Sequence, residues 1–261
     1  MLTYITWNVN PEIFNILGFP LRWYGLLFAS AFIFAYLILA NLFKKEKIPI
    51  ELLDKLTLYV GLGTIIGARL GHCLLYEPAF FLTHPLQILK IWEGGLASHG
   101  AAIGILFSIY LFCKKTGKKY LWVLDKLVIV IASAGFFIRM GNLMNSEIYG
   151  YPTNLPWAFI FVRENSLPSH PTQIYEGLSY LLLFFFLYKL YQKTKDKYES
   201  GFVFGAFLVL LFTIRFLLEF LKEPQVDSEK SMLLNLGQLY SIPFILVGIY
   251  FMVLRKKKQV V

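Results

Sequence analysis

Three arginines lie in stretches of the sequence that are otherwise strongly apolar: Arg69, Arg139 and Arg215. A guanidinium in the hydrocarbon core of a membrane costs about 2.5–3.5 kcal/mol on insertion scales, so such residues usually mark a functional site. Few carboxylates accompany them, although Glu219 follows Arg215 by four positions and would share its helical face. The pattern predicts an electropositive pocket. Because a guanidinium donates two parallel N–H bonds to a phosphate, we expect a lipid phosphate there.

A structural role is the alternative for each arginine. Backbone carbonyls can accept hydrogen bonds from the guanidinium, which then ties helices together. We weigh this alternative most heavily for Arg69, and less for Arg139 and Arg215.

One histidine has neighbours that suggest proton transfer. His99 stands in a glycine-rich stretch at positions 94–100, Gly-Gly-Leu-Ala-Ser-His-Gly. Histidine side chains titrate near neutral pH, so they can accept a proton from a thiol or an alcohol. A lone histidine is more often a structural hydrogen-bond former, but the glycines and the arginines favour a base here. His72 and His170 are weaker candidates for the same role.

Polar residues follow Arg139 at short intervals. Asn142 would share a helical face with Arg139, and Asn145 and Glu147 would extend the cluster where the helix leaves the membrane. The spacing fits no metal site, since the acids are too few and neither HExxH nor paired histidines occur. GxSxG and phosphate-binding loops are absent too, so the nucleophile of any reaction would belong to the substrate. We expect no metal and no organic cofactor.

The composition indicates a membrane protein. Of 261 residues, 57% are apolar and 16% are charged, whereas soluble domains average about 45–50% and about 25%. These values exclude disorder, a nucleic-acid-binding arm and an ordinary cytosolic enzyme. Cys73 and Cys113 lie in apolar stretches without a CxxC pattern, so we interpret them as buried small hydrophobes.

Apolar runs long enough to cross a bilayer recur along the chain. They predict an all-α, polytopic integral membrane protein of about seven transmembrane helices, with residues 1–261 forming a single domain. The first run is too long for a signal-peptide core and has no basic segment before it. The predicted spans are 21–43, 56–76, 96–112, 121–140, 174–191, 202–221 and 236–254.

Lysine and arginine are concentrated in alternate loops, at 44–47, 114–119, 189–197 and 255–258. Because cytoplasmic loops carry the excess of basic residues, the amino terminus is predicted outside and the carboxyl terminus in the cytoplasm. The net charge of +9 is then mainly a topology signal. We therefore expect no nucleic-acid partner.

Glycines recur at intervals that suit close helix packing. Gly63, Gly67 and Gly71 lie four apart in the second span, and Gly100 and Gly104 open the third. The sixth span opens with glycines at 201 and 205. Small residues at this spacing let helix backbones approach closely in lipid, so we interpret all of them as packing positions.

The alternation of the spans places the candidate residues at one depth. The second, fourth and sixth spans run outward, which puts Arg69, Arg139 and Arg215 toward their outer ends. The third span runs inward, so His99 lies at its outer start. We expect these groups to meet in a site that opens to the outer face.

The polar segment at 139–150, Arg-Met-Gly-Asn-Leu-Met-Asn-Ser-Glu-Ile-Tyr-Gly, resembles the signature of the prolipoprotein diacylglyceryl transferase family, G-R-x-G-N-x-x-N-x-E-x-x-G. Two departures occur. Ile138 stands where the family usually has glycine, and Leu211 and Phe212 stand where it usually has Tyr-Gly before Arg215. The other stretches that match, in order, are 22–25, 67–71, 94–100, 170–176, 215–220 and 237–239.

The resemblance implies an enzyme of the bacterial cytoplasmic (inner) membrane with seven spans and an active site on the outer, periplasmic side. It implies transfer of the diacylglyceryl group of phosphatidylglycerol to the lipobox cysteine in a prolipoprotein signal peptide. A thioether forms and glycerol phosphate leaves, as the first step of lipoprotein maturation. Phosphatidylglycerol, the prolipoprotein and membrane lipid are the partners, and no cofactor is needed.

The resemblance also implies roles for single residues. His99 would be the base for the thiol, and Arg139 and Arg215 would hold the phosphodiester and stabilise the leaving phosphate. The implied substrate-binding set is completed by Tyr24 near the lipid glycerol, Asn142, Asn145 and Glu147 at the headgroup or the helix end, Glu219 beside Arg215, and Arg69 and Gly150.

Two other functions would also place charges in a membrane protein. A transporter or flippase for an anionic lipid or peptide would use arginines in a cavity, but it predicts charges along the full depth of the membrane. A non-catalytic scaffold leaves His99 and the arginines without a task.

Overall fold

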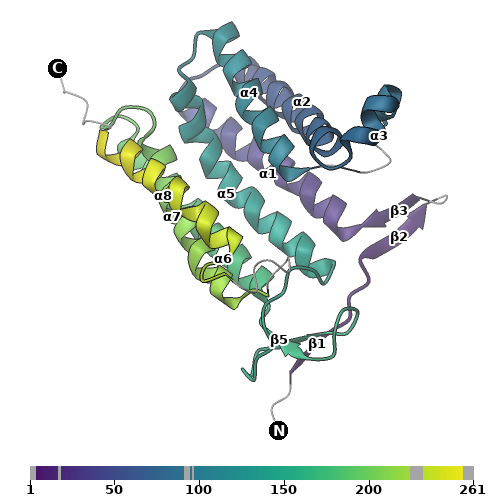
Figure 1. Ribbon diagram of the computed structural model, residues 1–261. Coiled ribbons are helices and arrows are strands. Elements are labelled where there is room, and N and C mark those ends of the chain that lie inside the picture. The colour runs from purple at the N-terminus through teal and green to yellow at the C-terminus, as the bar shows by residue number, and fades with distance from the viewer. Residues whose placement is uncertain (1–3, 17–18, 91–94, 96, 224–231, 255–261) are drawn as a thin grey trace. The chain divides into compact units, whose positions relative to one another are not determined.

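The protein is described by a computed structural model that covers residues 4–16, 19–90, 95, 97–223 and 232–254. It is mostly helical, and Figure 1 shows the arrangement of its elements. In chain order they are β1 (Ile5–Trp7), β2 (Glu12–Ile16), β3 (Phe19–Arg22), α1 (Trp23–Lys45), α2 (Ile50–Leu75), α3 (Pro78–Thr83), η1 (Pro85–Leu89), α4 (Ser98–Thr116), α5 (Tyr120–Met144), β4 (Phe159–Phe161), β5 (Pro168–Ser169), α6 (Thr172–Thr194), α7 (Phe202–Leu218), η3 (Glu219–Leu221) and α8 (Leu236–Leu254).

Each predicted span coincides with a helix. Six of the described helices, with α7 continued through η3, are long and apolar enough to cross a membrane: α1, α2, α5, α6, α7 and α8. Helix α4 is not among the six, so the seventh crossing and the orientation of the termini stay predictions. Helix α2 begins at Ile50, earlier than predicted, because its first turns carry polar residues that an apolar window excludes.

Short strands outside the helices correct the all-α prediction. β1 pairs in parallel with β4, which pairs antiparallel with β5, and β2 and β3 form an antiparallel hairpin. The strands have two to five residues each, too few for a periodic pattern to stand out in an apolar sequence.

The chain divides into two compact units, which are described separately: residues 39–123, and residues 1–38 with 124–261. In the first unit, α2 packs on α4 through glycine, as predicted. A Cβ on Gly104 would lie 2.1 Å from the carbonyl oxygen of Gly63, and one on Gly67 would lie 2.4 Å from that of Gly100. Such distances admit no side chain, so the two backbones are in direct contact.

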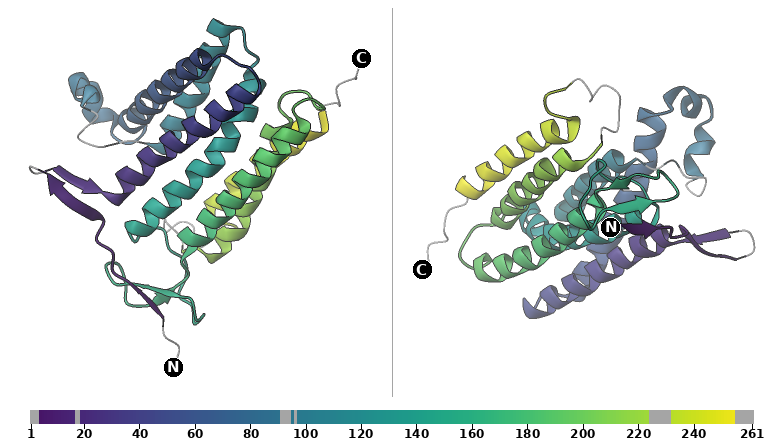
Figure 2. Two further views of the ribbon diagram at one scale, coloured as in Figure 1. Left: turned by 180° about the vertical axis from the view of Figure 1, so that it is seen from behind. Right: turned by 90° about the horizontal axis from the view of Figure 1, so that it is seen from below.

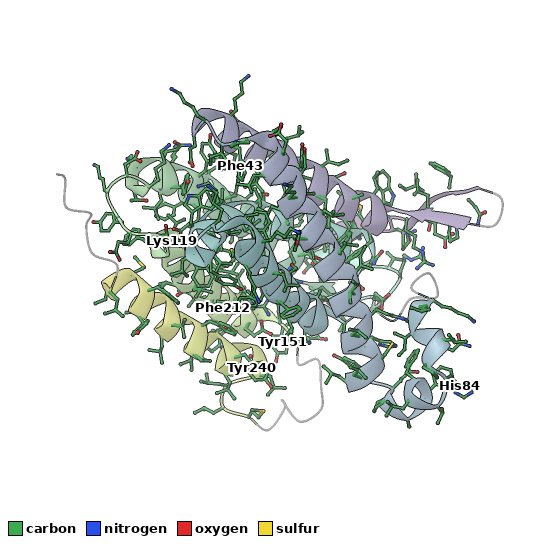
Figure 3. The ribbon with its side chains drawn as sticks, turned by 90° about the horizontal axis from the view of Figure 1, so that it is seen from above. Phe43, His84, Lys119, Tyr151, Phe212 and Tyr240 are labelled. Carbon is green, nitrogen blue, oxygen red and sulfur yellow. The ribbon has the colours of Figure 1, made fainter. Side chains whose placement is uncertain are left out.

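In the second unit, α7 and α8 lie side by side, as Figures 1 and 2 show. A Cβ on Gly205 would lie 2.8 Å from the carbonyl oxygen of Gly248, which confirms a packing role for Gly205. Further along, Phe212, labelled in Figure 3, stacks on Phe244 with ring centroids 4.3 Å apart. The outer face of α8 is apolar and exposed, including Leu246, which suits contact with lipid.

Gly201 has a different role from the one predicted. Its φ of 107° forms the left-handed residue that precedes α7. The carboxylate of Asp125, near the start of α5, accepts hydrogen bonds from the backbone N–H groups of Gly201 (2.6 Å) and Phe204 (2.8 Å). Asp125 therefore caps the amino-terminal end of α7.

Candidate active site

The polar cluster predicted after Arg139 forms as a chain of contacts at the end of α5. Arg139 Nη1 donates to Asn142 Oδ1 at 3.1 Å, so these two residues share a helical face. Asn142 Nδ2 donates in turn to Glu147 Oε1 at 2.7 Å, and Asn145 Nδ2 donates to the same oxygen at 3.3 Å. The amide of Asn142 thus lies between a cation and an anion, with each of its ends facing the group of opposite polarity.

The backbone that carries Glu147 is held in an unusual conformation. Ser146 and Ile148 have φ values of 58° and 60°, in a region that β-branched residues rarely adopt. Two side chains from the start of α6 hold this segment: Thr172 Oγ1 donates to the carbonyl of Ile148 (2.9 Å), and Gln173 Nε2 donates to that of Glu147 (2.7 Å). Sequence reasoning did not assign this function to Thr172 and Gln173, because it depends on a contact between distant segments.

Arg139 is not free, contrary to the expectation of an electropositive pocket with few acids. Its Nε lies 2.6 Å from Glu176 Oε2, and the other oxygen of Glu176 lies 2.8 Å from Lys222 Nζ. Lys222 also lies 3.3 Å from Glu219 Oε2. Glu176 and Lys222 are 0% and 4% exposed. The predicted pairing of Glu219 with Arg215 is therefore wrong, since Glu219 binds Lys222.

Arg215 differs from the other cations of this cluster. Its partly buried guanidinium forms no hydrogen bond or ion pair with any residue that the structure describes. It belongs to the cluster nevertheless, because both Arg139 and Arg215 act electrostatically on the Tyr180 hydroxyl. Glu147 likewise has no cation partner in the described part of the chain. Among the described residues the cluster holds three cations and three carboxylates, of which Arg215 and Glu147 form no ion pair.

Gly150, which the family resemblance placed in the site, lies where three segments meet. Its N–H donates to the carbonyl of His170 at 2.9 Å, and it forms an isolated β-bridge with Lys222. A Cβ at this position would lie 2.2 Å from the carbonyl oxygen of Leu221 and 2.7 Å from Thr172 Cγ2. Glycine is therefore required for Lys222 to approach the polar segment so closely.

Tyr24 reaches the same cluster from the start of α1. A Cβ on Gly141 would lie 2.7 Å from the Tyr24 ring, so the ring packs directly on the α5 backbone. Glu147 and Arg139 both act electrostatically on its hydroxyl. Tyr24 thus joins the predicted group that contains Arg139, Asn142, Asn145 and Glu147.

Arg69, in the other unit, is held in another way. Its guanidinium donates to the carbonyls of Gln87 (2.6 Å), Ile88 (2.9 Å) and Gly95 (3.4 Å), and it lies 5.1 Å from the centre of the Phe81 ring. The carbonyl-binding alternative therefore describes Arg69. These contacts tie the segment after α3 to α2, and the expected contact of Arg69 with a phosphate stays a prediction.

The histidines are found in three settings. His99 is exposed in the first turn of α4 and belongs to the same unit as Arg69. His72 Nε2 lies 3.5 Å from Glu77 Oε1. His170 Nδ1 lies 3.4 Å from the Tyr175 hydroxyl, and burial lowers the pKa of His170. Of the predicted glycine-rich stretch at 94–100, residues 94 and 96 lie outside the described residues. The expected meeting of His99 with Arg139 and Arg215 stays a prediction.

Comparisons with known proteins identify the family of this chain. The model of the family described as prolipoprotein diacylglyceryl transferase matches residues 11–254. A phosphatidylglycerol–prolipoprotein diacylglyceryl transferase of Tolumonas auensis is 46% identical, covering 97% of this chain and 98% of its own length. Proteins of the same name from Bacteroides fragilis and Chloroherpeton thalassium are 44% and 42% identical, covering 99% and 95% of this chain and 98% and 92% of their own lengths. A match that includes every residue of the α5–α6–α7 cluster shows that this chain belongs to the prolipoprotein diacylglyceryl transferase family.

Proposed function

We propose that this protein transfers the diacylglyceryl group of phosphatidylglycerol to the thiol of the lipobox cysteine in a prolipoprotein. The relatives bear names that describe this activity, and the chain aligns with them over nearly its whole length. The reaction forms a thioether and releases glycerol phosphate, the first step of lipoprotein maturation. The whole chain, residues 1–261, acts as one transferase domain.

The observation that carries the proposal is the contrast between Arg139 and Arg215. Arg139 is fixed by Glu176 and Asn142, whereas Arg215 has no protein partner among the described residues. An unpaired guanidinium in an apolar helix is costly unless an anion binds it. The phosphate of phosphatidylglycerol supplies that anion, and it can accept two parallel N–H bonds.

The chemistry requires a base and a stabilised leaving group. His99 accepts the proton of the substrate thiol, and the thiolate attacks the glyceryl carbon that carries the phosphate. A C–S bond forms while the C–O bond to the phosphate breaks, and the electron pair leaves with glycerol phosphate. Arg215 and Arg139 stabilise the charge that gathers on this phosphate in the transition state.

The remaining polar groups orient the lipid. Asn142, Asn145 and Glu147 lie together at the end of α5, and the Glu147 carboxylate has no cation partner in the described part of the chain. That carboxylate can accept hydrogen bonds from the hydroxyls of a glycerol headgroup. Tyr24 lies beside the glycerol backbone of the lipid.

The protein works in the bacterial cytoplasmic membrane. With α4 as the seventh crossing, the amino terminus lies outside and the carboxyl terminus in the cytoplasm, as the distribution of basic loops favours. The ends of α5 and α7 that carry Arg139 and Arg215 then face the outer side, where phosphatidylglycerol and the signal peptide meet.

A transporter would need polar groups along the depth of the helices. Asp125 and Lys126 do lie buried near the other end of α5. However, Asp125 caps α7, and Lys126 hydrogen-bonds to the Tyr191 hydroxyl. Both groups are engaged within the protein, which favours the transferase.

The proposal is tested with purified protein, phosphatidylglycerol vesicles and a synthetic lipobox peptide, with lipidation followed as a mass shift of the peptide. Arg215→Ala should reduce kcat/KM by about 10²–10³-fold, the loss typical of removing one preorganised electrostatic group. His99→Ala should reduce it strongly as well.

Arg163→Ala is the matched control, because Arg163 is exposed and lies outside the cluster. It should retain normal turnover. Absence of lipidated peptide with the unmodified protein would refute the transferase, and full turnover by Arg215→Ala would refute the phosphate assignment alone.

A further inference from the structure

Glu176 is a carboxylate without solvent access, on the second turn of α6. Each of its oxygens faces a different cation: Oε2 lies 2.6 Å from Arg139 Nε, and Oε1 lies 2.8 Å from Lys222 Nζ. A single carboxylate thus joins α6 to the end of α5 and to the segment after α7. The proposed reaction gives it no role beyond its contact with Arg139.

The contact with Glu176 bears on the orientation of the Arg139 guanidinium. Glu176 Oε2 lies 2.6 Å from Nε as an ion pair without hydrogen-bond alignment, while Asn142 Oδ1 accepts a hydrogen bond from Nη1 at 3.1 Å. Contacts at two different positions on the planar group restrict where it can lie. The remaining N–H groups of Arg139 are then already oriented to bind a phosphate. This fixed orientation is the preorganisation that transition-state stabilisation requires.

Lys222 is the second cation that this buried carboxylate contacts. Its ammonium is 4% exposed and contacts both Glu176 and Glu219. Its backbone is held against Gly150, where a Cβ would lie 2.2 Å from the carbonyl of the preceding residue, Leu221. Without that cation, Glu176 would share its charge with Arg139 alone. Removing one member of a buried ion pair leaves its partner uncompensated.

We propose that Glu176 is a positioning residue of the transfer reaction: it orients Arg139 toward the phosphate, and Lys222 is its second ion-pair partner. The proposal rests on the proposed function. In the alternative, Glu176 has a purely structural role: it stabilises the fold through its ion pair with Lys222 and does not orient Arg139 for the reaction.

The test compares Lys222→Met with the double variant Glu176→Gln/Lys222→Met, in the vesicle and lipobox-peptide assay. Both variants lack the lysine, and they differ only in whether Arg139 keeps its carboxylate. We expect the double variant to have a kcat at least tenfold below that of Lys222→Met, with KM for phosphatidylglycerol changed less than kcat. Thermal unfolding should show the double variant at least as stable, since it also lacks the buried carboxylate that has lost its lysine.

Equal kcat values for the two variants would overturn the proposal, because Glu176 would then act only as the ion-pair partner of Lys222. Glu164→Gln is the matched control, since Glu164 is exposed in a turn, and it should leave kcat unchanged. An inactive unmodified protein would count against the proposed function itself, and is thereby distinguished from a failure of Glu176 alone.

A shorter carboxylate decides the question if the double variant does not fold. Glu176→Asp keeps the charge that Lys222 needs but withdraws it from Arg139 by one methylene. A fall in kcat of at least tenfold at an unchanged melting temperature supports positioning. An unchanged kcat overturns it.

Discussion

Arg69, which is buried, and Arg139, which is half-buried, both lie toward the end of an apolar helix, yet they are bound by different kinds of partner. Arg69 donates to three backbone carbonyls beside the glycine-packed pair α2–α4. Arg139 is held by a carboxylate and an amide that belong to a larger network. Hydrogen bonds to neutral carbonyls anchor a guanidinium to the fold. Contacts with a carboxylate and an amide can in addition set the orientation of the guanidinium toward a ligand. The kind of partner, more than the degree of burial, therefore distinguishes these two arginines.

Replacing Arg139 should have the largest effect on activity. Arg139→Ala removes the cation that Glu176 and Asn142 orient, so kcat/KM should fall by about 10²–10³-fold in the lipobox-peptide assay. Arg139→Lys should recover little, because an ammonium cannot reproduce the two-sided contact. A loss below tenfold would place Arg139 with Arg69 as a structural group.

Replacing Arg69 should affect stability instead. Arg69→Ala leaves the carbonyls of Gln87 and Ile88 without their donor, which should cost about 3 kcal/mol of unfolding free energy. Thermal unfolding in detergent would measure this loss, and turnover per folded molecule should change less than for Arg139→Ala. Normal stability together with lost turnover would instead make Arg69 a substrate group.

The glycine contact of α2 and α4 offers a smaller and sharper change. Gly104→Ala would place a Cβ 2.1 Å from the carbonyl oxygen of Gly63. Separating the helices should cost about 1–3 kcal/mol, measured by thermal unfolding. Gly61→Ala is the control, because nothing lies within 4 Å of its added Cβ. Alanine is the better helix former, so this variant should gain about 0.5–1 kcal/mol.

The smallest expected effect is a stabilisation within the polar network. Ile148 has a φ of 60°, and asparagine tolerates this region better than a β-branched residue. Ile148→Asn should therefore raise the unfolding free energy by about 1 kcal/mol, with turnover retained because Thr172 and Gln173 still hold the neighbouring carbonyls. Ile174→Asn, in the first turn of α6, should destabilise the protein. A loss of stability on Ile148→Asn would mean that packing of the isoleucine outweighs the strain.

Local patterns in the sequence predicted the helices and part of the site. Apolar runs located all seven helices that correspond to spans, and four-residue glycine spacing located the α2–α4 contact. The i, i+3 relation predicted that Arg139 and Asn142 share a helical face, which the hydrogen bond between them confirms. These features depend on neighbours in the chain, and a sequence displays them directly.

Long-range pairing was not predictable in the same way. Lys222 follows a span as an ordinary loop cation would, yet it folds back onto Glu176, 46 positions away. Glu219 has the spacing for a helical pair with Arg215, but α7 ends at Leu218, and Glu219 turns to Lys222. The positive φ of Ile148 occurs where Thr172 of α6 donates a hydrogen bond to its carbonyl. Position 148 holds neither glycine nor asparagine, so the sequence does not indicate this conformation.

The capping of α7 by Asp125 has a consequence for depth. Arg215 lies 14 positions beyond Gly201, about 21 Å along a straight helix. Since a helix resists compression along its axis, the distance from this cap to the Arg215 guanidinium is set by the number of residues between them. One added turn between the two points would carry Arg215 about 5.4 Å further. That shift would separate it from the polar cluster around Arg139, so the number of residues after the cap has to be kept.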